Sequence, residues 1–193
     1  MDKKAKNEHT SANPLSTTRR VIWYALRTLL IICAVLALCY AVFTEAMYIS
    51  NMYVVATEGM ALRAETILTS GSRSELEQYF TDEQLDRDYM LYDGAYDDFT
   101  VDNYDYRYSI EGIKVLPWSS TGSITYVERI PSIIASADVD AEEGAVAPAW
   151  TPVRYAIVLS KIEGRWLISD LTVLEENPEE EVLPTPDYSQ LED

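Results

Sequence analysis

Histidine and cysteine are almost absent from this chain of 193 residues. The one histidine is His9, and the two cysteines, Cys33 and Cys39, lie within a single apolar segment. The rest of the sequence therefore lacks the side chains that Ser-His-Asp or Cys-His catalysis, the usual zinc sites and disulfide bonds require. We expect a domain of about 130 ordered residues that is stabilised by its hydrophobic core, with no cofactor and no metal ion.

Positive charge is also scarce, except at the amino terminus. The chain has 15 Lys and Arg against 32 Asp and Glu, a net charge of −17. The residues after Glu45 hold nine Lys or Arg and twenty-nine Asp or Glu, so this part alone carries −20. Because nucleic-acid binding relies on Lys and Arg contacts to phosphates, the sequence excludes a nucleic-acid partner. The glycines stand alone, so no Gly-rich loop for phosphate binding is present either.

The longest apolar segment lies near the amino terminus. Residues 28–44 are seventeen residues without a charged side chain, and the apolar character extends back to Val21. About 20 apolar residues are needed to cross the hydrocarbon core of a bilayer. Arg27 lies near one end, where a long basic side chain can reach the headgroups. The sequence therefore predicts a transmembrane helix over residues 21–44.

A cleaved signal peptide and a lipoprotein signal are the alternatives to a permanent anchor. The apolar segment is longer than the roughly 7–15 residues of a signal peptide, and the sequence Thr44-Glu45-Ala46 is a poor cleavage site. A lipid-attachment site needs a small residue just before the cysteine, whereas Leu38 precedes Cys39. An uncleaved anchor is therefore the favoured interpretation.

The charges on the two sides of the anchor predict its orientation. Residues 1–27 carry a net charge of +4, in contrast to the acidic region that follows the anchor. Short basic flanks stay on the cytoplasmic side of a membrane. We expect a single-pass protein of the plasma membrane, with residues 1–20 in the cytoplasm and a domain of residues 45–174 outside.

Helical patterns open the region after the anchor. Apolar residues recur at spacings of three and four from Ile49 to Leu68, which predicts a helix that ends near Ser70. Capping-box patterns at Ser74 and Thr81 predict two short helices.

Strand patterns follow the helices. Apolar and polar residues alternate from Tyr104 to Ile110, and Gly112 shifts the alternation by one, which indicates a β-bulge. A tight turn is expected at Glu163-Gly164. Three further strands are expected at residues 124–134, crossed by Pro131, at residues 153–159 and at residues 166–174. Helices followed by strands are typical of the α+β class, here with the helices packed on a bent antiparallel sheet.

Two segments lack a regular pattern. Residues 138–152 are acidic and contain Pro, which is typical of a solvated loop. Residues 175–193 are rich in Glu and Pro, so we expect a disordered acidic tail.

The order of elements and the last hairpin resemble the nuclear transport factor two-like superfamily of cone-shaped (cystatin-like) α+β domains. In this hairpin Val153–Ser160 is followed by Leu167–Leu174, and a Gly-basic-Trp sequence, Gly164-Arg165-Trp166, opens the last strand. The resemblance covers residues 46–174. Membrane-anchored versions of this cone occur in bacterial conjugation and secretion channels, so the resemblance implies an assembly subunit of a cell-envelope complex.

Aspartates and tyrosines are concentrated between Asp86 and Tyr108. Their spacing does not fit a calcium-binding loop. A Tyr and Asp pair inside the cone could act as acid and base, as in the ketosteroid isomerases of the same superfamily. We favour a third interpretation, a solvated acidic loop whose alternating tyrosines pack on one face of the sheet.

Aromatic residues near this region are the candidates for a contact surface with partner proteins. The candidates are Tyr104, Tyr106, Tyr108, Trp118 and Trp150. Trp118 and Trp150 could instead line a pocket or cover the core, and covering the core is favoured; Trp166 is expected in the core.

The leading functional hypothesis is a non-catalytic scaffold or assembly subunit of a cell-envelope complex, such as a secretion or conjugation machine. The alternative is a small-ligand-binding or enzymatic cone that uses Tyr and Asp in a pocket. A deep apolar cavity with an inward Asp would favour the alternative, and a filled cone would favour the scaffold.

Overall fold

The computed structural model describes residues 14–139 and 144–179. His9 and most of the predicted cytoplasmic tail lie outside the described residues, and so do residues 180–193 of the predicted acidic tail. The chain divides into two compact units, residues 1–44 and residues 45–193. One long helix, α1 (Pro14–Thr69), contributes residues to both units.

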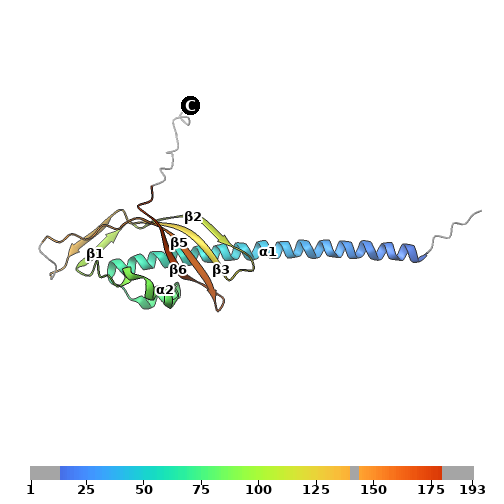
Figure 1. The fold of residues 1–193 in the computed structure, drawn as a ribbon, viewed down its shortest axis with the longest axis horizontal. Helices are drawn as coiled ribbons and strands as arrows, with labels where there is room; N and C mark the ends of the chain where they lie inside the picture. Colours follow the sequence, from blue (N-terminus) through green and yellow to red (C-terminus); the bar gives the residue numbers. More distant parts are fainter. Residues whose placement is uncertain (1–13, 140–143, 180–193) are drawn as a thin grey trace, which may run out of the picture. The chain divides into compact units, whose positions relative to one another are not determined.

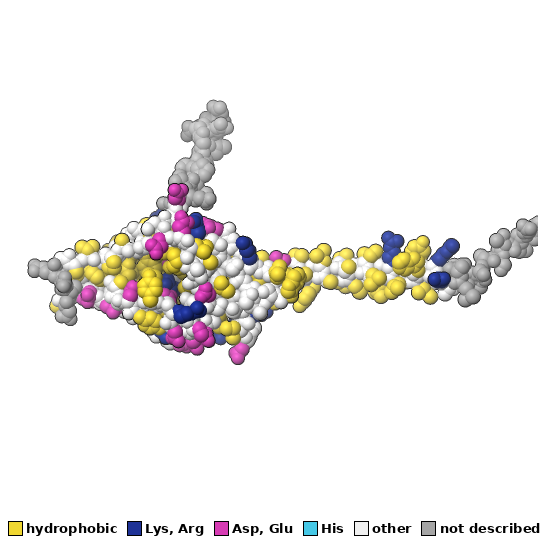
Figure 2. Space-filling view, in the orientation of Figure 1, with side chains coloured by type: hydrophobic (Ala, Val, Ile, Leu, Met, Phe, Trp, Pro, Cys, Tyr) yellow, Lys and Arg dark blue, Asp and Glu magenta, His cyan; other side chains and the backbone are white. Residues whose placement is uncertain are grey.

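The first unit consists of the apolar part of α1. Its large apolar side chains from Val21 to Phe43 are all exposed, so they pack against no other part of the unit (Figure 2). A helix that is apolar on every side is typical of a membrane span. The hydroxyl groups of Thr28 and Thr44 each donate a hydrogen bond of 2.9 Å to the carbonyl oxygen four residues earlier. Both hydroxyls are thus satisfied within the helix, which an apolar environment requires. Among the described residues, α1 is the one helix long and apolar enough to cross a membrane.

The described residues of the second unit form short helices and six strands, and this α+β class confirms the prediction (Figure 1). The Thr81 hydroxyl accepts a hydrogen bond from the Gln84 amide and caps α2, as predicted. The preceding helical element differs from the prediction. It is a short 3-10 helix, and its N-cap residue is Ser72 and not the predicted Ser74. After α1 the helical elements are η1 (Arg73–Gln78), α2 (Asp82–Arg87) and η2 (Tyr89–Leu91). The strands are β1 (Phe99–Tyr104), β2 (Arg107–Val115), β3 (Thr121–Arg129), β4 (Ile133–Ala137), β5 (Val153–Ile162) and β6 (Arg165–Glu176).

The strands form two antiparallel sheets. β2, β3, β5 and β6 lie in that order in a four-stranded sheet, and β1 pairs with β4 in a two-stranded sheet. The register of β2 shifts between Ile110 and Gly112, which confirms the predicted bulge. The turn at Glu163-Gly164 has φ values of 50° and 85°, as a tight hairpin turn requires.

Four predictions about the strands and the segments beside them were wrong. The strand expected to start at Tyr104 is two strands, because β1 ends at Tyr104 and β2 begins at Arg107. The strand expected over residues 124–134 is divided around Pro131, which has no N–H to donate to a ladder. β1 lies within the segment interpreted as a solvated acidic loop, and Glu175 and Glu176 belong to β6 and not to a tail.

The main core lies between α1 and the four-stranded sheet. Met52, Ala56 and Met60 of α1 pack with buried residues of β3, β5 and β6, including Trp166 as predicted. A Cβ atom on Gly59 would lie 2.9 Å from the Cβ of Tyr79, so glycine lets this part of α1 approach its neighbour closely. A second cluster contains Ala64, Ile67 and Leu68 of α1 with Tyr96, Ile130 and Trp150.

Candidate functional site

The five predicted contact residues do not form one surface. Tyr108 and Trp118 are exposed, at 44% and 79%, whereas Tyr104 and Tyr106 are half-buried. Trp150 is only 6% exposed and belongs to the second core cluster. The prediction that it lies on a contact surface was therefore wrong. Trp118 lies in the turn between β2 and β3 and does not cover the core.

Two of the predicted tyrosines, Tyr106 and Tyr108, instead join Tyr53 of α1 and Tyr126 of β3 in an aromatic row, defined as Tyr53, Tyr106, Tyr108 and Tyr126. The hydroxyls of Tyr53 and Tyr108 are 3.3 Å apart, and the rings of Tyr108 and Tyr126 stack with centroids 5.5 Å apart. The hydroxyls of Tyr126 and Tyr106 are hydrogen-bonded at 2.9 Å. The aromatic row thus runs from the exposed Tyr53 and Tyr108 to the fully buried ring of Tyr126.

A buried cluster of charged residues lies next to Tyr106 of the aromatic row. Arg63 comes from α1, Asp88 follows α2, and Glu128 lies on β3, and they are 3%, 7% and 0% exposed. Nε and Nη2 of Arg63 both donate to the carboxylate of Asp88, the second over 2.8 Å. Nη1 of Arg63 lies 3.9 Å from Oε2 of Glu128, which is beyond hydrogen-bonding distance. One guanidinium therefore faces two buried carboxylates.

Glu128 has a raised pKa. The pKa of its carboxyl lies at about 7, because burial, the largest cause, and Asp88 raise it by more than Arg63, Tyr106 and Trp150 lower it. Neither carboxylate oxygen of Glu128 has a hydrogen-bond partner among the described residues. Burial is also the main cause that raises the pKa of the Tyr106 hydroxyl, followed by Glu128. The cluster therefore gains or loses one proton near neutral pH.

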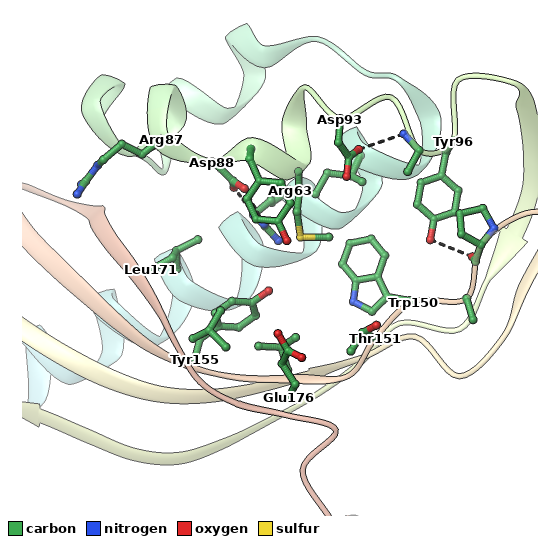
Figure 3. Close-up of a pocket in the computed structure, with 18 of the residues that line it drawn as sticks. Arg63, Arg87, Asp88, Asp93, Tyr96, Trp150, Thr151, Tyr155, Leu171 and Glu176 are labelled. Carbon is green, nitrogen blue, oxygen red and sulfur yellow. Dashed lines mark hydrogen bonds and ion pairs between the residues drawn. The ribbon is translucent and has the colours of Figure 1, made fainter.

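Arg63 and Asp88 also line a cavity of about 330 Å³ (Figure 3). Its aromatic wall includes Tyr96 and Trp150, whose rings are 6.5 Å apart, and the Tyr96 hydroxyl donates to the carbonyl oxygen of Pro148 over 3.1 Å. The further polar residues of its wall include Arg87, Asp93, Tyr155 and Glu176. Glu128 does not line the cavity.

In this arrangement no one carboxyl group meets both requirements of an acid or base catalyst. A general base needs a pKa near the working pH and access to the substrate. Asp88 lines the cavity but is held by two hydrogen bonds from Arg63, while Glu128 titrates near neutral pH but lies outside the cavity. The geometry is thus better suited to binding than to proton transfer.

Three of the aspartates between Asp86 and Tyr108 make separate contacts with other residues of the fold. Asp86 pairs with Arg73 at 2.6 Å, and Asp97 accepts a hydrogen bond of 2.8 Å from Ser70. Asp105 pairs with Arg107 at 2.6 Å. Because these carboxylates have different partners, they do not come together as one binding or catalytic site.

The residues of the buried cluster were missed because they are up to 65 positions apart in the sequence. A local signal existed for two of them. Arg63 lies three residues after Met60 and four before Ile67, so it falls on the apolar stripe of α1. Glu128 continues the inward alternation of Ile124 and Tyr126. A charged residue at a core position indicates a buried partner.

Comparison with known proteins adds no assignment, since no protein-family model, curated protein or solved structure matches this chain.

Proposed function

We propose that this protein is a single-pass protein of the plasma membrane whose domain of residues 45–174 lies outside the cell membrane. In this proposal the domain is a non-catalytic scaffold or assembly subunit of a cell-envelope complex, with the cone-like arrangement of the nuclear transport factor two-like superfamily. The exposed apolar segment of α1 supports the anchor. The charge of +4 before residue 28 and −20 after Glu45 supports the orientation.

The observation that carries the scaffold function is an aromatic surface beside an open strand edge. β2 is the end strand of the four-stranded sheet, and among the described residues it pairs with β3 alone. Tyr53 and Tyr108, at 42% and 44% exposure, lie together at this edge. Unpaired strand edges bind extended segments of other chains, and tyrosine is enriched in protein interfaces. A partner protein is therefore expected to bind along β2 and to cover these two rings.

Site-specific photo-crosslinking in native membranes tests this function. p-Benzoylphenylalanine in place of Tyr108 is expected to give one discrete adduct, which is lost when Tyr53 is replaced by Ala. The matched control places the same amino acid at Tyr89, which is more exposed, at 73%, but lies in η2. Adducts of equal yield from both positions, or none from position 108, would contradict a partner on β2.

The cavity beside Arg63 favours small-ligand binding as a second candidate function. Because Arg63 and Asp88 neutralise each other, the remaining charges of the wall are Arg87, Asp93 and Glu176. The balance of one cation and two anions, next to the ring of Trp150, suits an aromatic amine.

Benzylamine and benzoate form a matched pair of probes for this cavity. Benzylamine is expected to raise the melting temperature of the full chain and to change the fluorescence of Trp150, and the Glu176→Gln variant should weaken both effects. An equal response to benzoate would rule out the selectivity for a cation. That result would not bear on the crosslink from position 108, which lies outside the cavity.

A further inference from the structure

Two turns of the second unit lie beside the first residues of α1 that follow the apolar segment. The turn between β2 and β3 contributes Leu116 and Ser119 to a groove of about 520 Å³, which Glu45 and Ile49 of α1 also line. This is a contact within the second unit, because Glu45 is its first residue.

The turn between β5 and β6 reaches the same place. Lys161 lies at the end of β5, just before this turn, and its amide donates a hydrogen bond of 2.7 Å to the carbonyl oxygen of Ser120, which holds the end of β5 beside the turn between β2 and β3. The Lys161 ammonium donates to the Tyr48 hydroxyl over 3.1 Å and lies 4.3 Å from the centre of its ring. Both turns are therefore held against α1 between Glu45 and Ile49.

Three apolar side chains at or beside these turns are exposed and are not packed in the core of the domain. Trp118 is 79% exposed, Leu116 is 53% exposed and Ile162 is 43% exposed. We call these three residues the apolar tip. A tryptophan with so much exposed surface contributes little to the core. Exposed apolar side chains of this kind are typical of surfaces that contact a protein or a membrane.

The charge around the apolar tip differs from that of the rest of the domain. Lys114, Lys161 and Arg165 outnumber Glu45 and Glu163 here, a local net charge of +1, whereas the residues from Glu45 onward carry −21 in total. Lys114 and Arg165 are exposed. Tryptophan is enriched at the level of the lipid headgroups, and basic side chains near a membrane surface are attracted to anionic lipids.

The position of the tip along the chain supports the same partner. A hydrocarbon core takes up about 20 helical residues. Counted from Arg27, this length ends near Met47, so Glu45 and Tyr48 lie at the level of the headgroups when α1 crosses a bilayer. The side chains that line the groove with Glu45 then lie at the same level.

We propose that the apolar tip docks into the headgroup layer of the bilayer that holds α1, with phospholipid as its partner. The inference rests on the proposed membrane anchor. Trp118 would place its ring among the glycerol and upper acyl groups, while Lys114 and Arg165 meet lipid phosphates. The domain would thereby be attached to the membrane at a second point besides α1.

Depth-dependent fluorescence quenching of the full chain tests this docking. The label NBD is attached in detergent to Ser120→Cys in a Cys33→Ala, Cys39→Ala background, and the protein is reconstituted into vesicles of phosphatidylethanolamine and phosphatidylglycerol. The Ser120 side chain is exposed, and its fold contact is made by the backbone. Ile134→Cys is the matched control, because Ile134 is 56% exposed and adjoins Ile133, which packs on the cluster of Ala64 to Leu68. These residues are about 25–30 Å along α1 from Tyr48.

A third protein, labelled on native Cys33 in a Cys39→Ala background, reports whether α1 itself is in the bilayer. Lipids with a quencher near the headgroups are expected to quench position 120 but not position 134, and Trp118→Ser should remove most of the quenching at position 120. Quenching at Cys33 by deep quenchers without quenching at position 120 would overturn the docking and leave the anchor standing. Blue-shifted but unquenched emission at position 120 would assign the tip to a protein contact and equally overturn it. No quenching at Cys33 would overturn the anchor, and the docking with it.

Discussion

The guanidinium of Arg63 and the carboxylate of Glu128 face each other inside the domain, with 3.9 Å between Nη1 and Oε2. Nη1 and both oxygens of Glu128 have no hydrogen-bond partner among the described residues. The two groups therefore interact by charge without the directional bonds that Arg63 makes to Asp88. This difference leaves Glu128 free to take up a proton near neutral pH, and several predictions depend on it.

Glu128 is expected to make the domain less stable as the pH rises. Its pKa is 4.5 in an ordinary environment and about 7 in the folded domain. Between these values the folded state holds a proton that the unfolded chain has released, so the contribution of Glu128 is complete below pH 4.5 and is lost as the pH rises through 7. The change is on the order of 3 kcal/mol.

Thermal unfolding of the full chain and of the Glu128→Gln variant checks this dependence. The variant cannot titrate at this position, so the difference in melting temperature between the two proteins should change steadily from about pH 5 to about pH 8 in favour of the variant. Parallel pH curves for the two proteins would show that Glu128 has its ordinary pKa.

Tyr106 is expected to tune this titration. It lowers the pKa of Glu128 and is hydrogen-bonded to Tyr126. Tyr106→Phe should therefore move the titration of Glu128 to higher pH, which NMR of the labelled carboxyl carbon would measure. Tyr108→Phe is the control, because its hydroxyl contacts Tyr53 and not Glu128. A shift of the same size in both variants would argue against a specific effect of the Tyr106 hydroxyl.

Removal of Arg63 should be severe because it leaves two buried carboxylates without a cation. Arg63→Met is expected to destabilise the domain by about 3–5 kcal/mol at neutral pH. Arg154→Met is a close control, since Arg154 also pairs with two carboxylates, Glu111 and Glu175, but is 28% exposed. Exposed pairs contribute about 1 kcal/mol or less. Chemical denaturation that gives similar losses for both variants would contradict the importance of burial.

Gly59 is expected to be needed for the close approach of α1 to Tyr79. In an exposed helix alanine would be the better residue by up to about 1 kcal/mol. Here a Cβ atom would lie 2.9 Å from the Cβ of Tyr79, so Gly59→Ala should cost about 1–3 kcal/mol instead. Gly112→Ala should be nearly neutral, because no atom lies within 4 Å of its added Cβ. Urea unfolding of both variants would decide, and a stabilised Gly59→Ala variant would show that Tyr79 moves aside.

The apolar segment, the helical stripe of α1, the bulge before Gly112 and the last hairpin could all be predicted because each is a local pattern. The division around Pro131 and the strand β1 could not, since β1 forms by pairing with β4, which lies 29 to 38 residues later in the chain. The candidate site was harder still. Arg63 and Glu128 each interrupt an apolar pattern, but no spacing indicates that they meet.

The amino-acid sequence by itself determined the α+β order, the membrane-compatible helix and the lack of thiol and imidazole chemistry in the domain, because periodicity and composition are properties of neighbouring residues. Only the tertiary structure decided that Trp150 is buried while Trp118 is exposed, and that Arg63 lies between Asp88 and Glu128. Burial and charge pairing depend on how a helix packs on a sheet, and that packing joins residues far apart in the chain.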